Sequence, residues 1–338
     1  MHLFGKDLET DVAIVAEIGV NHEGDPTTAQ NLMQLAAEAG ADAVKFQSYT
    51  PARYASASDP ERLERVKRFS LSETAHRNLA KFAKEMGVAF FSTPLTEDMV
   101  ALLNELCPAI KIASGDLTFE PVIRAAAATG KPVVVSTGGG TTTEIDRAVS
   151  WVKDEVGKED VSDQLVLMHC VSAYPTPITE INVRAVPFLA KRYGLKVGFS
   201  NHVIGDEACL AAVALGANVV EVHFTDRKEG RSFRDHQLSF EPPDLAELIR
   251  GINVIRASLG SFEKKPAPCE LESIASMRKG LVAARDLKAG ITLTTSDLMY
   301  ARPASEFAAS EIGQVVGCRL TADTNAGETI RRDRIDRG

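Results

Sequence analysis

The sequence has no excess of positive charge and no long apolar run, and each absence argues against a class of protein. Its 338 residues carry 38 basic and 46 acidic side chains, a formal net charge of −8. This acidic balance argues against broad binding to nucleic acid or to anionic membrane surfaces. No apolar stretch approaches a membrane span, and the first residues, MHLFGKDLETD, lack the apolar core of a signal peptide. We expect no nucleic-acid partner, no membrane partner and a cytoplasmic location.

Cysteine is also scarce and shows no pattern. The five cysteines are scattered, odd in number and without a Cys-x-x-Cys pair. This predicts reduced thiols, as in a cytosolic protein, and excludes a disulfide framework. Hydrophobic residues make up 44% of the chain and charged residues 25%, which is ordinary for a globular enzyme. At this length we expect one large domain and a small one, because single cores stop growing near ~250–300 residues.

The chain repeats one sequence pattern, in which a short apolar run ends in polar residues and a helix-length segment follows. The eight runs are Val12–Ala16, Ala43–Phe46, Val88–Phe91, Ala109–Ala113, Pro132–Val135, Leu165–Met168, Lys196–Phe199 and Val219–Val222. Eight such units over roughly 250 residues are the plan of a (β/α)8 barrel. A doubly wound open sheet is the alternative, but it would not need eight similar strands, and no GxGxxG motif is present. The prediction is an α/β fold with a barrel domain over residues 1–261.

The last two runs frame a stretch around which the rest is organised, Lys196–Asp226. It reads as strand, loop, helix and strand, with Asp206 able to cap a helix that runs through Gly216. His202 follows the first strand and His223 ends the second. In a parallel sheet both ends emerge at one carboxyl rim, with neighbouring strands ~4.8 Å apart. The two histidines can therefore share a metal ion or small ligand. The alternative is that each histidine merely caps its strand; two on adjacent strand ends favour a site.

Other polar side chains belong to the same predicted rim. Lys45 and Lys111 lie inside apolar runs, where a buried charge is costly without an anionic partner. The hydroxyl side chains near them are those of Thr93, Ser114, Ser136 and Ser200. Together these groups predict a cradle for phosphate or carboxylate; the alternative is that each lysine pairs with a structural carboxylate. Glu17, which ends the first strand, can hold water or act as a base.

The loop beyond the eighth strand adds Asp235 and His236, an acid-base pair that is weak evidence by itself. The insertion between the second and third strands, Ser48–Gly87, departs from a minimal unit. Within it, Pro60–Ser70 has apolar residues at spacing three in a charge run. We interpret it as a solvated amphipathic helix without a catalytic role. Three nearby side chains are candidates for a lid over the barrel mouth: Tyr49, Arg53 and Tyr54.

The composition and residue pattern of the chain change after the last barrel helix, which is expected at Pro243–Leu259. Residues 262–279 begin with a segment rich in lysine, proline and glutamate and are predicted to be an exposed linker. Residues 280–338 combine short apolar runs with turn glycines. They predict a β-rich domain of about 60 residues, which is marginal in size by itself.

In order and spacing, the motifs resemble those of the sialic acid synthase family, whose members condense phosphoenolpyruvate with an N-acetylated amino-aldose. The motifs are Ala16–Gly24, Val44–Gln47, Phe91–Pro94, Lys111–Asp116, Ser136–Gly138, His169–Cys170, Tyr174–Pro177, Gly198–His202 and His223–Thr225. No single motif decides the matter, but their order over nearly the whole chain is specific. The tail resembles that family's antifreeze-like (SAF) domain, including Arg302–Pro303 after a short strand.

The resemblance implies a role for each matching residue. His202 and His223 match ligands of a divalent metal, usually Mn²⁺, with Mg²⁺ or Co²⁺ also possible. Glu17 and Asp235 are the acids that would act with them. The phosphoenolpyruvate positions are Lys45, Thr93, Lys111, Ser114, Ser136, Ser172 and Ser200, and the sugar positions are Gln47, Asp116, Tyr174, Asp235 and Arg302. The resemblance also implies a domain-swapped homodimer, in which Arg302 serves the partner's site; otherwise it would be an ordinary surface arginine.

Three departures from the family fall mainly on the sugar side. Ser172 stands where the bacterial sialic acid enzymes have asparagine, Asp116 replaces a frequent glutamate, and Ser48–Ser70 does not align with their sugar-contacting loop. The resemblance therefore implies the condensation but leaves the aldose open. Candidates are N-acetylmannosamine or the precursor of a legionaminic, pseudaminic or surface-polysaccharide sugar.

Two rival classes of function remain. A phosphoenolpyruvate-using synthase for octulosonate or heptulosonate, or a lyase running similar chemistry in reverse, would share the barrel. Those synthases are not expected to carry the C-terminal module, and the metal-dependent ones use a cysteine ligand without an obvious match here. The other rival is a non-enzymatic sugar- or metal-binding protein, against which the buried lysines argue.

Overall fold

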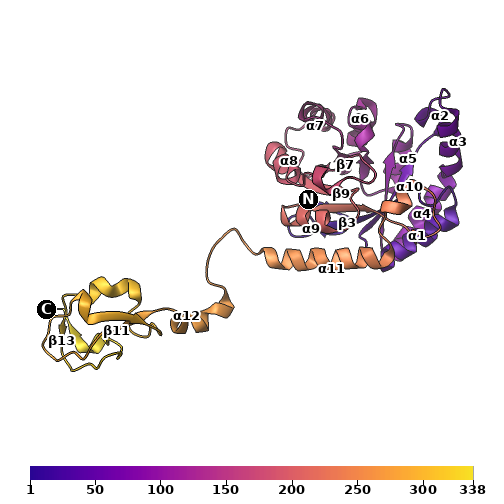
Figure 1. The fold of residues 1–338 in the computed structure, drawn as a ribbon. Helices are drawn as coiled ribbons and strands as arrows, with labels where there is room; N and C mark the ends of the chain where they lie inside the picture. Colours follow the sequence, from indigo (N-terminus) through magenta and orange to yellow (C-terminus); the bar gives the residue numbers. More distant parts are fainter. Residues whose placement is uncertain (338) are drawn as a thin grey trace. The chain divides into compact units, whose positions relative to one another are not determined.

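The structure, a computed structural model, describes residues 1–337 and divides the chain into two compact units (Figure 1). The first unit is Met1–Gly260, and the second begins at Ser261. None of the helices in the described part of the chain is both long and apolar enough to cross a membrane. All five cysteines are unpaired, as their scatter in the sequence predicts.

The first unit contains an eight-stranded parallel barrel. Its strands are β3 (Ala13–Gly19), β4 (Ala43–Ser48), β5 (Ala89–Pro94), β6 (Ile110–Ile112), β7 (Val133–Ser136), β8 (Leu165–His169), β9 (Lys196–Asn201) and β10 (Val219–His223). Hydrogen-bonded neighbours run in the order β5-β4-β3-β10-β9-β8-β7-β6, and β5 contacts β6 across the remaining gap. Because the last strand pairs with the first, the sheet closes on itself. The predicted barrel is confirmed, and the open-sheet alternative is excluded.

Helices follow the strands and cover the outer face of the barrel (Figure 1). They are α1 (Pro26–Glu38), α4 (Glu73–Met86), α5 (Met99–Leu106), α6 (Glu120–Ala128), α7 (Thr142–Val156), α8 (Ala185–Tyr193), α9 (Glu207–Ala214) and α11 (Pro242–Leu259). Three more helices lie in loops: α2 (Pro51–Tyr54), α3 (Pro60–Phe69) and α10 (Arg234–Leu238). Asp25 caps α1 by accepting from the backbone N–H groups of Thr27 and Thr28. Asp206 precedes α9 as predicted, but its side chain makes no capping hydrogen bond.

Apolar side chains fill the lower part of the barrel interior. The inward-facing residues there are Ala13, Val15, Ala43, Phe91, Ala109, Val134, Val166, Met168 and Val219. The N-terminal hairpin of β1 (His2–Leu3) and β2 (Lys6–Asp7) adds Leu3 to this cluster, and Phe4 contacts Phe91 edge-to-face. Gly198 leaves space for Met168, because a Cβ at that position would lie 2.3 Å from the Met168 Sδ. Above this filled base, inward polar side chains near the carboxyl ends of the strands face a cavity.

The second unit has its own small core and short antiparallel pairs. Its elements are α12 (Leu271–Met277), β11 (Gly280–Ala283), β12 (Leu298–Ala301), β13 (Arg319–Leu320) and β14 (Ile335–Asp336), with β11 paired to β12 and β13 to β14. Leu281, Leu293 and Phe307 are among the buried residues that hold it together. The predicted β-rich module is present. Residues 262–279 are largely exposed, but they differ from a plain linker because they contain α12.

Candidate active site

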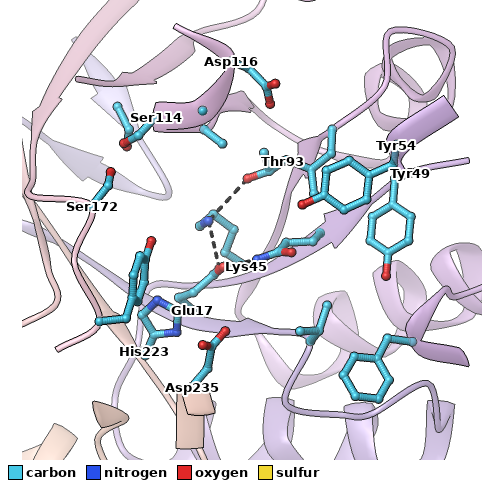
Figure 2. A pocket seen from close by; sticks show the side chains of 18 of the residues that line it. Glu17, Lys45, Tyr49, Tyr54, Thr93, Ser114, Asp116, Ser172, His223 and Asp235 are labelled. Carbon is cyan, nitrogen blue, oxygen red and sulfur yellow. Dashed lines mark hydrogen bonds and ion pairs between the residues drawn. The ribbon is translucent and has the colours of Figure 1, made fainter. Parts of the chain in front are cut away.

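A cavity of about 1160 Å³ opens at the carboxyl ends of the barrel strands (Figure 2). All the predicted site residues of the first unit line it: Glu17, Lys45, Gln47, Thr93, Lys111, Ser114, Asp116, Ser136, Ser172, Tyr174, Ser200, His202, His223 and Asp235. Arg302 belongs to the second unit, where it is exposed and directly follows β12. The barrel therefore brings together every predicted group that lies within its own chain segment.

The strand register explains why acids and bases meet in this cavity. Side chains alternate along a strand, so every second residue of each barrel strand points inward. Glu17 on β3 is the ladder partner of Lys45 on one side and of His223 on the other. Ser200 on β9 is likewise the partner of Glu221 on β10. Above the apolar base, the next inward level of the barrel is consequently charged.

Lys45 is shared between two carboxylates. Its Nζ lies 2.9 Å from Glu17 Oε2 and 3.6 Å from Glu221 Oε1, and it donates to Thr93 Oγ1 at 3.3 Å. Burial lowers the pKa of Lys45, but the two carboxylates outweigh burial and raise it above its ordinary value. The two carboxylates therefore favour the charged form of Lys45. It has the structural carboxylate partners that the alternative interpretation of the sequence required.

Of the two acids beside Lys45, Glu17 is the one whose charged form is less favoured, because its pKa is raised whereas that of Glu221 is lowered. Burial raises the pKa of Glu17 by more than Lys45 lowers it, and the nearby charge of Glu221 raises it further. Gln47 donates a long hydrogen bond to the Glu17 carboxylate, at 3.4 Å. A carboxyl with a raised pKa can exchange a proton closer to neutral pH, which suits Glu17 to acid-base chemistry.

Lys111 has oxygen partners of a different kind. Its Nζ donates to the Ser136 hydroxyl at 2.5 Å and to the Ile112 carbonyl at 3.3 Å. Burial lowers the pKa of Lys111, although Glu221 acts on it in the opposite direction at longer range. With neutral oxygens as its close partners, Lys111 is the more available of the two lysines for a bound anion.

Hydroxyl groups converge beside Lys111 around a glycine. Ser114 Oγ accepts from the backbone N–H of Gly138 at 3.1 Å and lies 3.1 Å from Cys170 Sγ. A Cβ on Gly138 would lie 2.4 Å from Ser172 Oγ and 2.8 Å from Ser114 Oγ. The missing side chain lets these hydroxyls and a backbone donor approach one point, as an anion cradle requires.

His202 and His223 lie together on the other side of the charged level. Their ring centroids are 5.4 Å apart, and the Tyr174 ring lies 4.2 Å from that of His202. The His202 Nδ1 donates to the Val171 carbonyl at 2.6 Å, which leaves Nε2 with a free lone pair. The His223 Nδ1 is buried without a hydrogen-bond partner. Burial lowers the pKa of each ring to about 4, so both are neutral near pH 7.

These two imidazoles fit a divalent metal with an open coordination shell. Among residues 1–337, no group of three or more His, Cys, Asp or Glu side chains is arranged to hold a metal. A metal at this place would therefore take two nitrogen ligands from the chain and the rest from water or substrate. Such a donor set suits a Lewis-acid site rather than a closed structural one.

The predicted sugar-side acids differ in their environments. Burial raises the pKa of Asp116 to about 6, and its Oδ2 is buried without a hydrogen-bond partner. Asp235 pairs with Arg234 at 3.1 Å, and Arg234 lies over the Tyr174 ring. His236 instead bonds to Thr225 at 2.7 Å and does not line the cavity. The predicted Asp235–His236 pair is therefore not a unit: only Asp235 faces the site.

The sequence interpretation missed two features of the cavity. The first is Glu221, which accepts a hydrogen bond from Ser200 at 3.1 Å. It is a buried acid inside an apolar strand, the same signal that identified the lysines.

The second feature is α3, interpreted from the sequence as a solvated helix without a catalytic role. Arg62, Arg65, Val66 and Phe69 of this helix line the cavity, as do Tyr49, Arg53 and Tyr54. The charged face of α3 was recognised, but the surface that its apolar face covers was not.

A closed parallel barrel with a polar cavity at the carboxyl ends of its strands is the architecture of (β/α)8 enzymes. The NeuB family model matches residues 32–264, and the SAF domain model matches residues 278–336. The chain belongs to the NeuB family and carries a C-terminal SAF domain.

Relatives match over almost the whole chain. The N,N'-diacetyllegionaminic acid synthase of Legionella pneumophila is 36% identical, with 96% of this chain and 94% of that protein covered. The human N-acetylneuraminate-9-phosphate synthase is 30% identical, with 96% and 92% covered. The crystal structure of the N-acetylneuraminic acid synthetase of Leptospira borgpetersenii superposes with a TM-score of 0.73 at 33% identity, covering 78% of this chain and 90% of that one. These three relatives are synthases of nonulosonic acids.

The two histidines make a prediction that does not depend on the reaction. Mn²⁺ should bind the full chain at one site, and this binding is measured as a fall in the EPR signal of the free ion. His202→Ala or His223→Ala should abolish the binding, so that the signal does not fall. Because both rings have pKa values of about 4, binding should persist at pH 6, where a histidine of ordinary pKa is largely protonated. His169→Gln, at the end of β8, is the matched control and should bind normally. Unchanged binding in both alanine variants would contradict the assignment.

Proposed function

We propose that the chain is a nonulosonic acid synthase that condenses phosphoenolpyruvate with an N-acetylated amino-aldose and releases phosphate. The observation that carries the proposal is one cavity holding both Lys111 with its cradle of hydroxyls and the neutral pair His202 and His223. An enol phosphate needs the first set, and an aldehyde to be activated needs the second. The relatives named above are synthases of legionaminic and neuraminic acids, and this similarity supports the same reaction.

The residues of the cavity form two groups, one for each substrate. Lys111, Ser136 and Ser114 bind the phosphate of phosphoenolpyruvate, aided by the other predicted members of this group: Lys45, Thr93, Ser172 and Ser200. Gln47, Tyr174, Asp116 and Asp235 hold the open-chain sugar so that its aldehyde carbon faces the methylene carbon of the enol. The new bond joins these two carbons. Water then adds at C2, and the C–O bond to phosphate breaks.

Glu17 is placed to handle the proton of the attacking water. It lies beside Lys45 and is the ladder partner of His223, between the phosphate side and the histidines. A divalent cation held by His202 and His223, for which we propose Mn²⁺ with Mg²⁺ or Co²⁺ as alternatives, would supply Lewis-acid polarisation of the aldehyde oxygen. Asp235, held by Arg234, lies on the sugar side and can accept or return a proton there.

The acceptor and the assembly complete the proposal. N-acetylmannosamine is one acceptor. The relative from Legionella pneumophila, an N,N'-diacetyllegionaminic acid synthase, favours a diacetamido sugar as the alternative. We propose a homodimer in the cytoplasm, in which the SAF domain of one chain serves the site of the other. A domain this small gains stability by docking, and twofold dimers are the commonest closed assembly.

The reaction is tested by measuring phosphate release from phosphoenolpyruvate with a panel of N-acetylated aldoses and with Mn²⁺. We expect phosphate to appear only when both substrates are present, together with an equal amount of a nonulosonic acid detected by mass spectrometry. Arabinose 5-phosphate and erythrose 4-phosphate test the rival barrel synthases. Turnover with either of these and with none of the amino-aldoses would overturn the proposal.

The different surroundings of Lys111 and Lys45 predict different effects when each lysine is replaced. Lys111→Met should raise the KM for phosphoenolpyruvate about tenfold to a hundredfold, because a buried charge-assisted contact is worth roughly 1.5–3 kcal/mol. The KM for the sugar should change little. Lys45→Met should weaken phosphoenolpyruvate too, but it also leaves Glu17 and Glu221 without their cation, so it should destabilise the barrel by ~3–5 kcal/mol in urea unfolding. An unchanged KM for phosphoenolpyruvate with a raised KM for the sugar would contradict the assignment.

The shared site is tested by mixing inactive chains. His202→Ala and Arg302→Ala chains are each expected to be inactive. If sites are shared, a mixed dimer has one site carrying both lesions and one carrying neither, so activity should return toward half of the wild-type value per dimer. The control mixes two chains that carry the same lesion. No recovery despite subunit exchange, shown by native mass spectrometry of tagged chains, would mean that Arg302 acts within its own chain or not at all.

A further inference from the structure

One short helix at the rim of the cavity carries an acid of the proposed sugar side. α10 has five residues, Arg234–Leu238, and Asp235 on it lines the cavity beside His223 (Figure 2). A helix of this length is not stable by itself. The residues that hold α10 against the barrel therefore decide where the Asp235 carboxylate lies.

Asn21 provides one of these supports. It lies in the β3–α1 loop, residues 20–25, and its side chain is completely buried. Its Nδ2 donates to the Phe224 carbonyl at 2.9 Å and to the Ser239 hydroxyl at 3.1 Å. The Ser239 hydroxyl in turn donates to the Asp235 carbonyl at 2.6 Å. A continuous chain of hydrogen bonds thus leads from the β3–α1 loop to the backbone of Asp235.

The direction of each bond in this chain is fixed by the atoms involved. The single hydrogen of the Ser239 hydroxyl goes to Asp235, so the hydroxyl oxygen accepts from Asn21, and the Phe224 carbonyl can only accept. Both hydrogens of the Asn21 amide are therefore used. Its Oδ1 is left buried without a hydrogen-bond partner, which is unfavourable. The contribution of Asn21 consequently lies in the two bonds that it donates.

A second buried contact joins the same loop to α10. His236 is fully buried, with its Nδ1 2.7 Å from the Thr225 hydroxyl and its Nε2 3.3 Å from the Glu23 carboxylate. Glu23 follows Asn21 by two positions. The β3–α1 loop therefore contacts α10 and the residue after it at two points, one through Ser239 and one through His236.

We propose that Asn21 is a positioning residue for Asp235, which it holds through Ser239 at the sugar side of the cavity. Asn21 follows Glu17 by four positions, and its other acceptor, Phe224, directly follows His223. The amide thus keeps the two proposed acids and one histidine in a constant arrangement. The inference rests on the proposed function, which assigns Asp235 to the sugar.

Asn21→Ala and Ser239→Ala test the chain of bonds in the full-length enzyme. With phosphoenolpyruvate and Mn²⁺, each variant should lower kcat/KM for the amino-aldose about tenfold to a hundredfold, because misplacing a reacting group can cost that much. The KM for phosphoenolpyruvate should change little, since Lys111 and Ser136 lie on β6 and β7. The double variant should lose no more than Asn21→Ala alone, because both substitutions break one chain of bonds.

Ser92→Ala, on β5, is the matched control. It also removes a buried serine hydroxyl, one that bonds to the Ser48 hydroxyl at 2.6 Å. It should lower the urea midpoint of unfolding as Ser239→Ala does, but leave kcat/KM for the amino-aldose unchanged. An equal loss of kcat/KM in Ser92→Ala, or losses that multiply in the double variant, would overturn the inference.

Hydrogen exchange followed by mass spectrometry needs no substrate, so it separates failure of this inference from failure of the proposed function. In Asn21→Ala and Ser239→Ala, the amide hydrogens of residues 234–240 should exchange about tenfold faster than in the unaltered chain. Those of β11, in the second unit, should exchange as before. Faster exchange in a chain that turns over no amino-aldose would support the link and overturn the proposed reaction. Unchanged exchange of residues 234–240 in both variants would overturn the link itself.

Discussion

One constraint governs the centre of this molecule: four ionisable side chains are buried inside the barrel, above its apolar base. Glu17, Lys45 and Glu221 lie on the neighbouring strands β3, β4 and β10, Lys111 lies on β6, and all four side chains are nearly fully buried. An isolated charge in such a place is costly, so each of these groups needs a partner of opposite charge or a hydrogen bond. Lys45 has two carboxylates as partners, and the Ser200 hydroxyl supports Glu221. The apolar base below holds the strands in the register that makes these contacts possible.

Much of this arrangement was predictable from the sequence, for physical reasons. A parallel strand buried on both faces reads as an apolar run, so Lys45 and Lys111 stand out, and the closure of the barrel collects the strand ends at one rim. Glu221 carries the same signal within VVEVH, two residues before His223, although the sequence analysis did not identify it. Which acid pairs with which lysine depends on ladder register, and a strand pattern does not specify it.

The insertion shows where sequence patterns stop being informative. The periodicity of α3 predicts a helix with one apolar face, and that helix is present. The periodicity contains no information about which surface the apolar face covers, because that depends on where the loop returns to the barrel. In the structure it packs with Tyr49 and Phe233 at the edge of the cavity. A helix interpreted as solvated therefore forms one wall of the candidate active site.

The pairing of the buried charges also sets an asymmetry between the two lysines. At this buried level the acids equal the lysines in number, so an entering anion does not meet an excess of basic side chains. Lys45 is held by two carboxylates, and moving it toward a ligand would weaken both contacts. Lys111 gives up only hydrogen bonds to a hydroxyl and a carbonyl. An anion is therefore bound chiefly through Lys111 and its hydroxyl neighbours, while Lys45 keeps Glu17 and Glu221 in place between the two ends of the cavity.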